Sequence, residues 1–209
     1  NSCMDCGFCQ LGFVVPPELM YNENYSYDGS STMGLRQHHI SIANQICDDF
    51  KLEHDSLVID IGSNAGVLLS GFRERGCKVL GIDPSVNVAN IARNKGIEVI
   101  GEFFSSELAK RIKKEYGQVS VITGTNVFAH IDDLHHFFKA ADILLKEDGI
   151  ICIEAPNLVA LIENLEYDTI YHEHLSYLSL KPLRDFCKKM HMDIFNVEFH
   201  EIHGGSFRY

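Results

Sequence analysis

The sequence predicts an α/β protein with a doubly wound, mostly parallel sheet of seven strands and a short amino-terminal arm. Three observations lead to this fold class. Short apolar segments alternate with helical patterns between residues 57 and 154, an order that requires parallel strands joined by right-handed crossovers. A glycine-bearing turn follows the first of these strands, and an acid ends the second. After residue 180 the pattern changes to one helix and a final strand pair, with one strand expected to run antiparallel.

The amino-terminal segment carries a cysteine pair, Cys3-x-x-Cys6, with Cys9 three residues further on. Such a turn presents two thiolates to one Zn²⁺, and structural zinc needs four ligands. No second pair follows, so the sequence shows half of a zinc site. A closed site and an empty knuckle are both open interpretations.

A polar, turn-rich arm comes next and holds three tyrosines close together, Tyr21, Tyr25 and Tyr27. One interpretation is an aromatic patch that packs the arm onto the domain. The other is an arm that reaches over a pocket and offers a phenol hydroxyl to a substrate. Spacing alone leaves both open.

The remaining elements follow from periodicity. From Thr32, apolar residues recur at a spacing of three to four, which predicts an amphipathic helix that we expect to cover a cofactor. Continuous apolar runs between turn residues predict parallel strands. These strands are 57–61, 78–82, 98–100, 119–122 and 150–154. The helices between them are 65–75, 86–95, 105–116 and 132–145. The chain is then predicted to form a helix at 181–190 and strands at 192–202 and 206–209.

The turn after the first strand is the predicted binding loop. Glycine at Gly62 and Gly66 allows positive φ and a close approach of backbone to ligand. Asp83 ends the next strand, twenty-one residues after Gly62, where an acid can accept both ribose hydroxyls of an adenosine. The pattern D-x-G-x-x-x-G, starting at Asp60 and lacking a lysine, departs from the dinucleotide and phosphate-loop fingerprints. A nucleoside cofactor is favoured over an NAD-type or ligand-free domain.

Two further loops follow carboxyl ends of predicted strands, where ligands of open α/β sheets bind. Glu102 and Phe103 lie after the third strand, where an acid can meet an adenine amine and an aromatic ring can cover the base. His130 lies after the fourth strand. It is either a site residue or a surface histidine that caps the next helix, and both remain open.

The densest ionisable cluster lies between Asp168 and Tyr177 and contains His172, Glu173 and His174. In an extended segment the two histidines would share a face, which suggests a metal. A general acid/base role suits the composition better, because histidine titrates near neutral pH and a neighbouring carboxylate can orient it. A solvated polar loop is the third interpretation.

Composition narrows the class of partner. The 209 residues suffice for one α/β domain and a small appendage. The net charge of −11 disfavours nucleic acid and anionic membranes, so a small-molecule substrate is expected. No run approaches bilayer-spanning length and no signal-peptide pattern opens the chain, so we expect a cytoplasmic protein. Four cysteines occur singly in helix and strand patterns and are expected to be reduced core thiols: Cys47, Cys77, Cys152 and Cys187.

The order of several motifs resembles a known family. These motifs are C-x-x-C-G, Y-x-Y-x-x-S-S-x-M, VIDIGSNAG, GIDPS, NVFAHI, E-x-P, YHEHLSYLS and HGGSFR. Together they resemble the sugar C-methyltransferases that act on nucleotide-linked deoxy keto-sugars, which are class I, Rossmann-like S-adenosylmethionine (SAM) methyltransferases. The resemblance covers nearly the whole chain, and YHEHLSYLS and HGGSFR are its most specific parts. The family's first cysteine pair and its carboxyl-terminal substrate portion are absent, which suggests a fragment truncated at both ends.

This resemblance implies a domain division and a set of roles. Residues 1–31 would be the remnant of a zinc-knuckle module with the tyrosine-rich arm, and residues 32–209 the SAM-dependent methyltransferase domain. The base that forms a sugar enolate would be His174, with Glu173 beside it and Tyr25, His130 and Tyr171 around the keto oxygen and ring. The implied cofactor contacts are Asp60, Gly62, Asn64, Gly66, Asp83, Glu102, Phe103 and Asn126. Zinc at Cys3 and Cys6 would be structural, in the full-length protein. An O- or N-methyltransferase and a non-catalytic nucleoside-binding domain are the alternatives.

Overall fold

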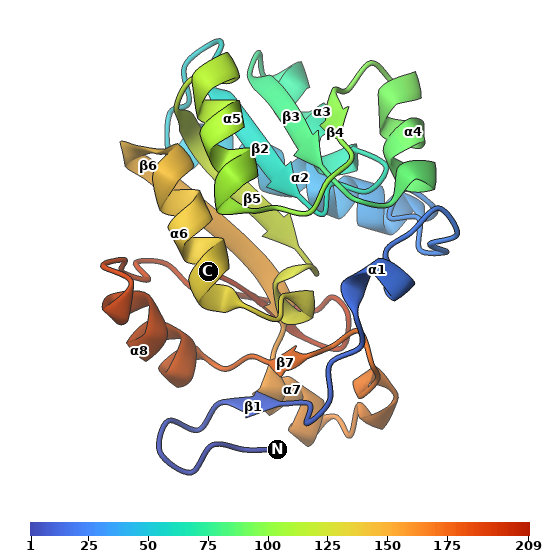
Figure 1. The fold of residues 1–209 in the computed structure, drawn as a ribbon, viewed down its shortest axis with the longest axis vertical. Helices are drawn as coiled ribbons and strands as arrows, with labels where there is room; N and C mark the ends of the chain where they lie inside the picture. The colour runs from blue at the N-terminus through green and yellow to red at the C-terminus, as the bar shows by residue number, and fades with distance from the viewer. The chain divides into compact units, whose positions relative to one another are not determined.

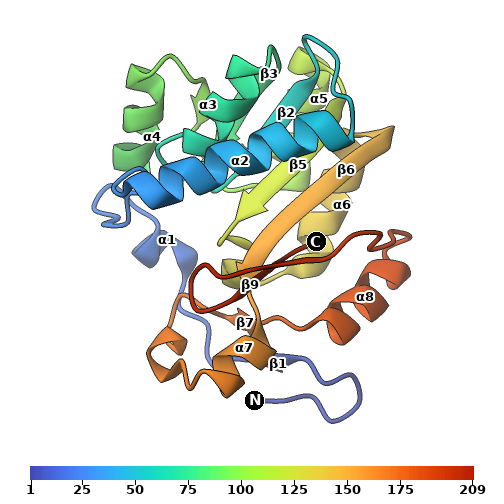
Figure 2. The same ribbon diagram turned by 180° about the vertical axis from the view of Figure 1, so that it is seen from behind.

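The computed structural model describes residues 1–209 and shows that the protein has an α/β fold (Figures 1 and 2). Its helices are α1 (Pro17–Met20), α2 (Met33–Asp49), α3 (Val67–Glu74), α4 (Val86–Asn94), α5 (Ser106–Tyr116), α6 (Leu134–Leu144), α7 (Leu158–Glu163) and α8 (Leu180–Lys189). Its strands are β1 (Cys9–Gln10), β2 (Leu57–Ile61), β3 (Lys78–Ile82), β4 (Val99–Ile100), β5 (Val119–Thr125), β6 (Leu145–Pro156), β7 (Ser176–Tyr177), β8 (Glu198–His200) and β9 (Ser206–Arg208). Two 3₁₀ turns complete the chain, η1 (Phe128–His130) and η2 (Tyr167–Thr169).

The central sheet has seven strands in the order β4-β3-β2-β5-β6-β9-β8. Strand β2 pairs in parallel with β3 and β5, and β3 pairs in parallel with β4. Strand β9 runs antiparallel to both of its neighbours, β6 and β8. The predicted mostly parallel seven-stranded sheet, ending in a pair with one antiparallel strand, is therefore confirmed. Strands β1 and β7 form a separate antiparallel ladder.

Two compact units make up the chain, and we describe each by itself. The glycine-loop unit comprises Pro17–Thr123 and Ala140–Ile151. The histidine-loop unit comprises Asn1–Pro16, Gly124–Lys139 and Cys152–Tyr209. The domain boundary expected between residues 31 and 32 stays a prediction.

Helices cover both faces of the strands in the glycine-loop unit. Helix α2 lies across one face in Figure 2, and α5 lies on the opposite face in Figure 1. Helix α2 begins after Thr32, whose hydroxyl accepts a hydrogen bond from the amide of Leu35 and so satisfies an orphan donor of the first turn. Helices α2 and α3 cross closely because Gly71 has no side chain; a Cβ there would lie 2.7 Å from Cβ of Ala43.

Several element boundaries differ from the predicted ones. Strand β6 begins at Leu145, earlier than the predicted start at residue 150. Strand β8 covers only Glu198–His200 instead of residues 192–202, because its neighbour β9 offers only the three residues Ser206–Arg208 for pairing. The sequence suggested no element between residues 155 and 180, where the structure has α7, η2 and β7. Strand length depends on the pairing partner, which local pattern does not contain.

The four scattered cysteines are all buried, as predicted. Burial raises the pKa of the Cys47 thiol to about 12 and that of Cys187 to about 11. These thiols therefore stay protonated at neutral pH and act as small apolar side chains. No helix combines the length and the apolar character needed to cross a bilayer.

Candidate functional site

A left-handed turn follows β2 and carries the predicted binding loop. Gly62 has φ of +68° and Gly66 has φ of +73°. The amide of Gly62 donates to the carbonyl of Ile82, at 2.8 Å, which ties the turn to the end of β3. A Cβ on Gly66 would lie 2.8 Å from Cδ1 of Ile97. Glycine is therefore required at residue 66 for packing as well as for backbone conformation.

Asp83 closes this turn from the end of the neighbouring strand. Its Oδ2 accepts the amide of Asn64 and its Oδ1 accepts the amide of Ser85, each at 2.8 Å. Burial raises the pKa of Asp83, and these two amide donors oppose that rise. Each carboxylate oxygen carries a second lone pair. Asp83 can therefore still accept hydroxyl donors from a ligand.

Asp60 is a second buried acid in the same unit. Its Oδ1 accepts a hydrogen bond from the hydroxyl of Thr123, at 2.7 Å. Burial raises the pKa of Asp60 to about 7, with a smaller rise from the charge of Asp83, while the Thr123 hydroxyl opposes the shift. A buried acid with so few donors is a favourable partner for a cationic ligand group.

The side chain of Asn64 holds the tyrosine-rich arm. Its Oδ1 accepts the amide of Gly29 at 2.9 Å, and its Nδ2 donates to the carbonyl of Tyr27 at 2.9 Å. Asn64 itself has φ of +48°, a conformation that asparagine tolerates. Sequence reasoning assigned Asn64 to the cofactor and did not foresee this contact with the arm. The arm is thus attached directly to the glycine loop.

Tyr25 lies in the tyrosine-rich arm, two residues before the Tyr27 carbonyl that Asn64 contacts. Its carbonyl accepts Nδ2 of Asn87 at 2.6 Å, and its ring packs edge-on against Tyr21 with centroids 5.4 Å apart. The interpretation of the tyrosines as a packing cluster therefore has a structural basis. The catalytic role expected for the Tyr25 hydroxyl stays a prediction.

The two residues after β4 differ in their surroundings. The carboxylate of Glu102 forms two hydrogen bonds with Arg111, at 2.8 and 2.9 Å, which lower its pKa. Its side chain is half exposed, and Phe103 is 40% exposed. The contacts of Glu102 and Phe103 with an adenine ring both stay predictions.

Oγ of Ser63 and Oδ1 of Asn87, both in the glycine-loop unit, are buried polar atoms with no hydrogen-bond partner. Buried polar groups are nearly always satisfied, so we predict that a ligand contacts these atoms. Sequence reasoning missed both residues. Their places, one residue after Gly62 and four residues after Asp83, were the available signal.

In the histidine-loop unit, Asn126 directly follows β5 and has φ of +56°. Its amide donates to the carbonyl of Glu154, at 2.8 Å, and its buried Oδ1 has no partner. The predicted role of Asn126 as a ligand contact stays a prediction, and the unsatisfied oxygen is consistent with it.

His174 is held in a defined tautomer. Its Nδ1 lies 2.7 Å from the carbonyl oxygen of Thr169. A carbonyl only accepts, so Nδ1 must carry the proton, and Nε2 of the neutral ring then carries a lone pair. Burial lowers the pKa of His174, while the Thr169 carbonyl and the Glu173 charge partly oppose this. At neutral pH His174 is therefore an unprotonated base at Nε2.

His130 and Tyr171 lie beside this base. The ring centroids of His130 and His174 are 5.2 Å apart, and those of Tyr171 and His174 are 4.4 Å apart. Burial, and secondarily the charge on His174, lowers the pKa of His130 to about 3. His130 is neutral at pH 7 and can donate through one ring nitrogen. The structure thus brings together three residues that the sequence assigned to one site.

The extended backbone on which the metal interpretation of the His172–His174 segment was based is not present. The amide of His174 donates to the carbonyl of Tyr171, so this segment is a turn and the two histidines do not follow the alternation of a strand. Nowhere in residues 1–209 do three or more His, Cys, Asp or Glu side chains form a group that could hold a metal ion.

The Cys3–Cys6 pair forms a tight turn in which the amide of Gly7 donates to the carbonyl of Cys3 at 2.9 Å. Hydrogen bonds from the backbone of Cys6 and Asp5 lower the pKa of the Cys3 thiol. This is a thiolate-favouring turn. No further ligand joins the pair, so the structure gives the zinc prediction no support.

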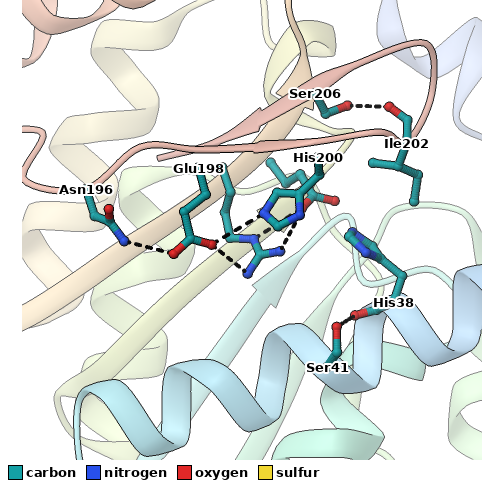
Figure 3. Close-up of polar contacts among 9 residues, drawn as sticks. His38, Ser41, Asn196, Glu198, His200, Ile202 and Ser206 are labelled. Carbon is teal, nitrogen blue, oxygen red and sulfur yellow. Dashed lines mark hydrogen bonds and ion pairs between the residues drawn. The ribbon is translucent and has the colours of Figure 1, made fainter.

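An ionic network with a buried Arg208–Glu154 pair and a partly exposed Glu198 lies at the end of the β6-β9-β8 ladder. Arg208 pairs with Glu154 at 3.2 Å and with Glu198 at 3.6 Å. The side chains of Asn196 and His200 are directed at the Glu198 carboxylate, at 3.2 and 3.4 Å (Figure 3). The network ties the E-x-P and HGGSFR motifs together, because Glu154 and Arg208 are opposite one another in register.

Comparisons with known proteins converge on one family. The sequence profile of a family described as "Methyltransferase domain" matches residues 41–191. C-methyltransferase NovU of Streptomyces niveus is 33% identical over 204 residues, which is 98% of this chain and 48% of NovU. A ubiquinone biosynthesis O-methyltransferase of Pelagibacter ubique is 29% identical over 173 residues, covering 73% of this chain and 70% of that protein.

A similar fold occurs among solved structures. Magnesium protoporphyrin IX methyltransferase from Synechocystis PCC 6803, with bound S-adenosylhomocysteine (SAH), has a TM-score of 0.63 at 15% identity and covers 87% of each chain. Identity this low supports the fold alone. The present chain spans about half the length of NovU.

Proposed function

The chain belongs to the methyltransferase domain family and is a class I SAM-dependent enzyme. From that premise we propose that it transfers the methyl group to the carbon atom next to the keto group of a nucleotide-linked deoxysugar. One observation carries the choice of carbon. The Thr169 carbonyl holds the Nδ1 proton of His174, which leaves Nε2 as a base in a partly buried loop. A carbon acid needs such a base, because its C–H bond is not nucleophilic until the proton leaves.

The glycine-loop unit fits a SAM ligand. Bound SAM supplies an electrophilic methyl group on a sulfonium centre. Asp83 keeps lone pairs for ribose hydroxyls, Asp60 offers a buried carboxyl to a cationic group, and Ser63 and Asn87 hold unsatisfied oxygens. Phe103 supplies an exposed aromatic ring for the base. Acceptors are thus present for the ribose hydroxyls and for a cationic group of the cofactor.

The histidine-loop unit supplies the proton chemistry. His174 removes the proton from the carbon beside the ketone: the C–H bond breaks, the proton goes to Nε2, and the electron pair delocalises toward the keto oxygen. Neutral His130 donates a hydrogen bond to the developing oxyanion, a contact worth about 3 kcal/mol when well aligned. We assign the same donor role to the Tyr25 hydroxyl, with Tyr171 against the sugar ring and Glu173 stabilising protonated His174.

The substrate class rests on sequence likeness. The motifs YHEHLSYLS and HGGSFR resemble those of sugar C-methyltransferases, and NovU carries the word C-methyltransferase in its name. The O-methyltransferase relative from Pelagibacter ubique favours a second candidate, methyl transfer to oxygen. Transfer to oxygen needs no carbon deprotonation, so the two candidates differ in one measurable step.

The test is hydrogen exchange at carbon in the presence of SAH, which blocks transfer. In deuterated water, the protein should introduce deuterium next to the ketone of a nucleotide-linked keto-deoxysugar. His174→Ala should abolish exchange and leave the Kd for SAH, measured by calorimetry, within a few fold. His172→Ala, an exposed histidine two residues away, is the matched control and should exchange normally. Full exchange by His174→Ala would exclude His174 as the base, and methylated oxygen without any exchange would favour the O-methyltransferase.

A further inference from the structure

The loop that holds His174 is itself supported by a short chain of contacts. Thr169, whose carbonyl accepts the Nδ1 proton of His174, is anchored twice to the carbonyl of Glu166. Its hydroxyl donates to that oxygen at 2.8 Å and its amide donates at 3.2 Å. These two bonds close the η2 turn and fix the direction of the Thr169 carbonyl. The hydroxyl bond is the shorter of the two.

The HGGS turn between β8 and β9 packs against the carboxyl group of the same residue, Glu166. Gly204 has φ of +76°, and a Cβ there would lie 2.6 Å from the carboxyl carbon of Glu166. The carbonyl of Gly204 accepts Nδ2 of Asn164, at 2.9 Å. Glycine at residue 204 therefore allows the turn to pack directly against the residue that anchors Thr169. This assigns a physical role to a motif that the chemistry left unused.

We propose that Thr169 is a positioning residue: its hydroxyl, anchored on Glu166 and supported by the HGGS turn, sets the tautomer of the His174 base. The inference rests on the proposed function, because it concerns the base of that reaction. A free neutral imidazole prefers its proton on Nε2, the opposite of what a base acting through Nε2 needs. The acceptor on Nδ1 reverses this preference, and it can do so only while the Thr169 carbonyl points at the ring.

The test compares Thr169→Val, which keeps the shape and removes the hydroxyl, with Thr169→Ser, which keeps the hydroxyl. The ¹⁵N chemical shifts of the His174 ring distinguish the two tautomers and need no substrate. In the wild-type chain they should show the proton on Nδ1. Thr169→Val should shift the population toward Nε2–H and lower kcat about tenfold, part of the contribution of a general base, with KM within twofold. Thr169→Ser should restore both readouts.

A second pair of variants tests the HGGS turn. Gly204→Ala introduces backbone strain at φ of +76° and requires the carboxyl end of the Glu166 side chain to move, whereas Gly117→Ala introduces similar strain at φ of +91° with no atom within 4 Å. Only Gly204→Ala should change the His174 tautomer. An unchanged Nδ1–H signature and unchanged kcat in Thr169→Val would overturn the inference, as would a Thr169→Ser variant that behaves like valine. Activity in His174→Ala would instead defeat the proposed function.

Discussion

The buried carboxyl of Asp60 should make the stability of the protein fall as pH rises through the neutral range. Its folded pKa is about 7, against 3.8 when it is not perturbed. Between these two values the folded state keeps a proton that the unfolded chain releases, so the free energy of unfolding decreases with pH. The full difference corresponds to about 4 kcal/mol, reached once the pH exceeds both values. We therefore expect Asp60→Asn, which keeps the shape and cannot ionise, to remove this loss.

The assay is urea unfolding of both proteins at pH 5 and pH 8. The loss of unfolding free energy between these pH values should be larger in the wild type than in Asp60→Asn by about 2.7 kcal/mol, the part of the shift between pH 5 and 7. Comparing the two proteins cancels other titrating groups. Asp48→Asn is the control, because that carboxylate is exposed and its pKa is lowered by Arg75, so it stays ionised throughout. Equal pH dependence in wild type and Asp60→Asn would refute the reasoning.

Three further outcomes are expected. The pKa of His130 is lowered from 6.5 to about 3, so neutral His130 contributes stability above pH 6.5 that is lost as the pH falls. Between pH 7 and pH 5, the free energy of unfolding measured in urea should therefore fall by about 2 kcal/mol less in His130→Gln than in the wild type. Equal losses in the two proteins would contradict this. Asn64→Ala removes two bonds to the arm and should increase amide exchange at Gly29, measured by NMR; unchanged protection would show that the arm is held elsewhere. Arg208→Met leaves the Glu154 carboxylate buried without its cation and should cost about 3 kcal/mol in urea unfolding, partly recovered by adding Glu154→Gln; a neutral single variant would contradict the pairing.

The local sequence pattern was sufficient to predict structure where apolar residues and glycines occur at characteristic spacings. Two local patterns predicted the parallel core and the loop of the glycine-loop unit. They are the apolar run at residues 57–61 followed by Gly62, and the strand followed by Asp83. Three site residues from separate parts of the sequence, His130, Tyr171 and His174, were assigned to one place because their motifs resemble a family. That assignment needed no geometry.

Long-range partners were invisible to such reasoning. The expected contact of Asn64 with the cofactor stays a prediction, and the bonds of its side-chain amide to arm residues 35 and 37 positions earlier were not foreseen. The expected contact of Glu102 with the cofactor likewise stays a prediction, and the ion pair of its carboxylate with Arg111 was not foreseen. The His172–His174 segment was given a strand-like spacing, whereas a hydrogen bond turns it back on itself. The partners of Asn64 and Glu102 lie nine or more residues away along the chain, whereas the bond that turns the His172–His174 segment joins residues only three apart.

The sequence by itself determined the alternation of strands and helices between residues 57 and 154, the family, and the set of residue types available for methyl transfer, because hydrophobic period and turn residues act within a few positions of one another. Only the tertiary structure decided the chemical state of those residues. Whether Asp60 holds a proton depends on burial and on the hydroxyl donor of Thr123, and which nitrogen of His174 carries one depends on the carbonyl acceptor of Thr169; the fold brings both within hydrogen-bonding distance. Burial and hydrogen bonding are properties of neighbours in space, and so the fold is what converts a list of ionisable side chains into a base of defined tautomer.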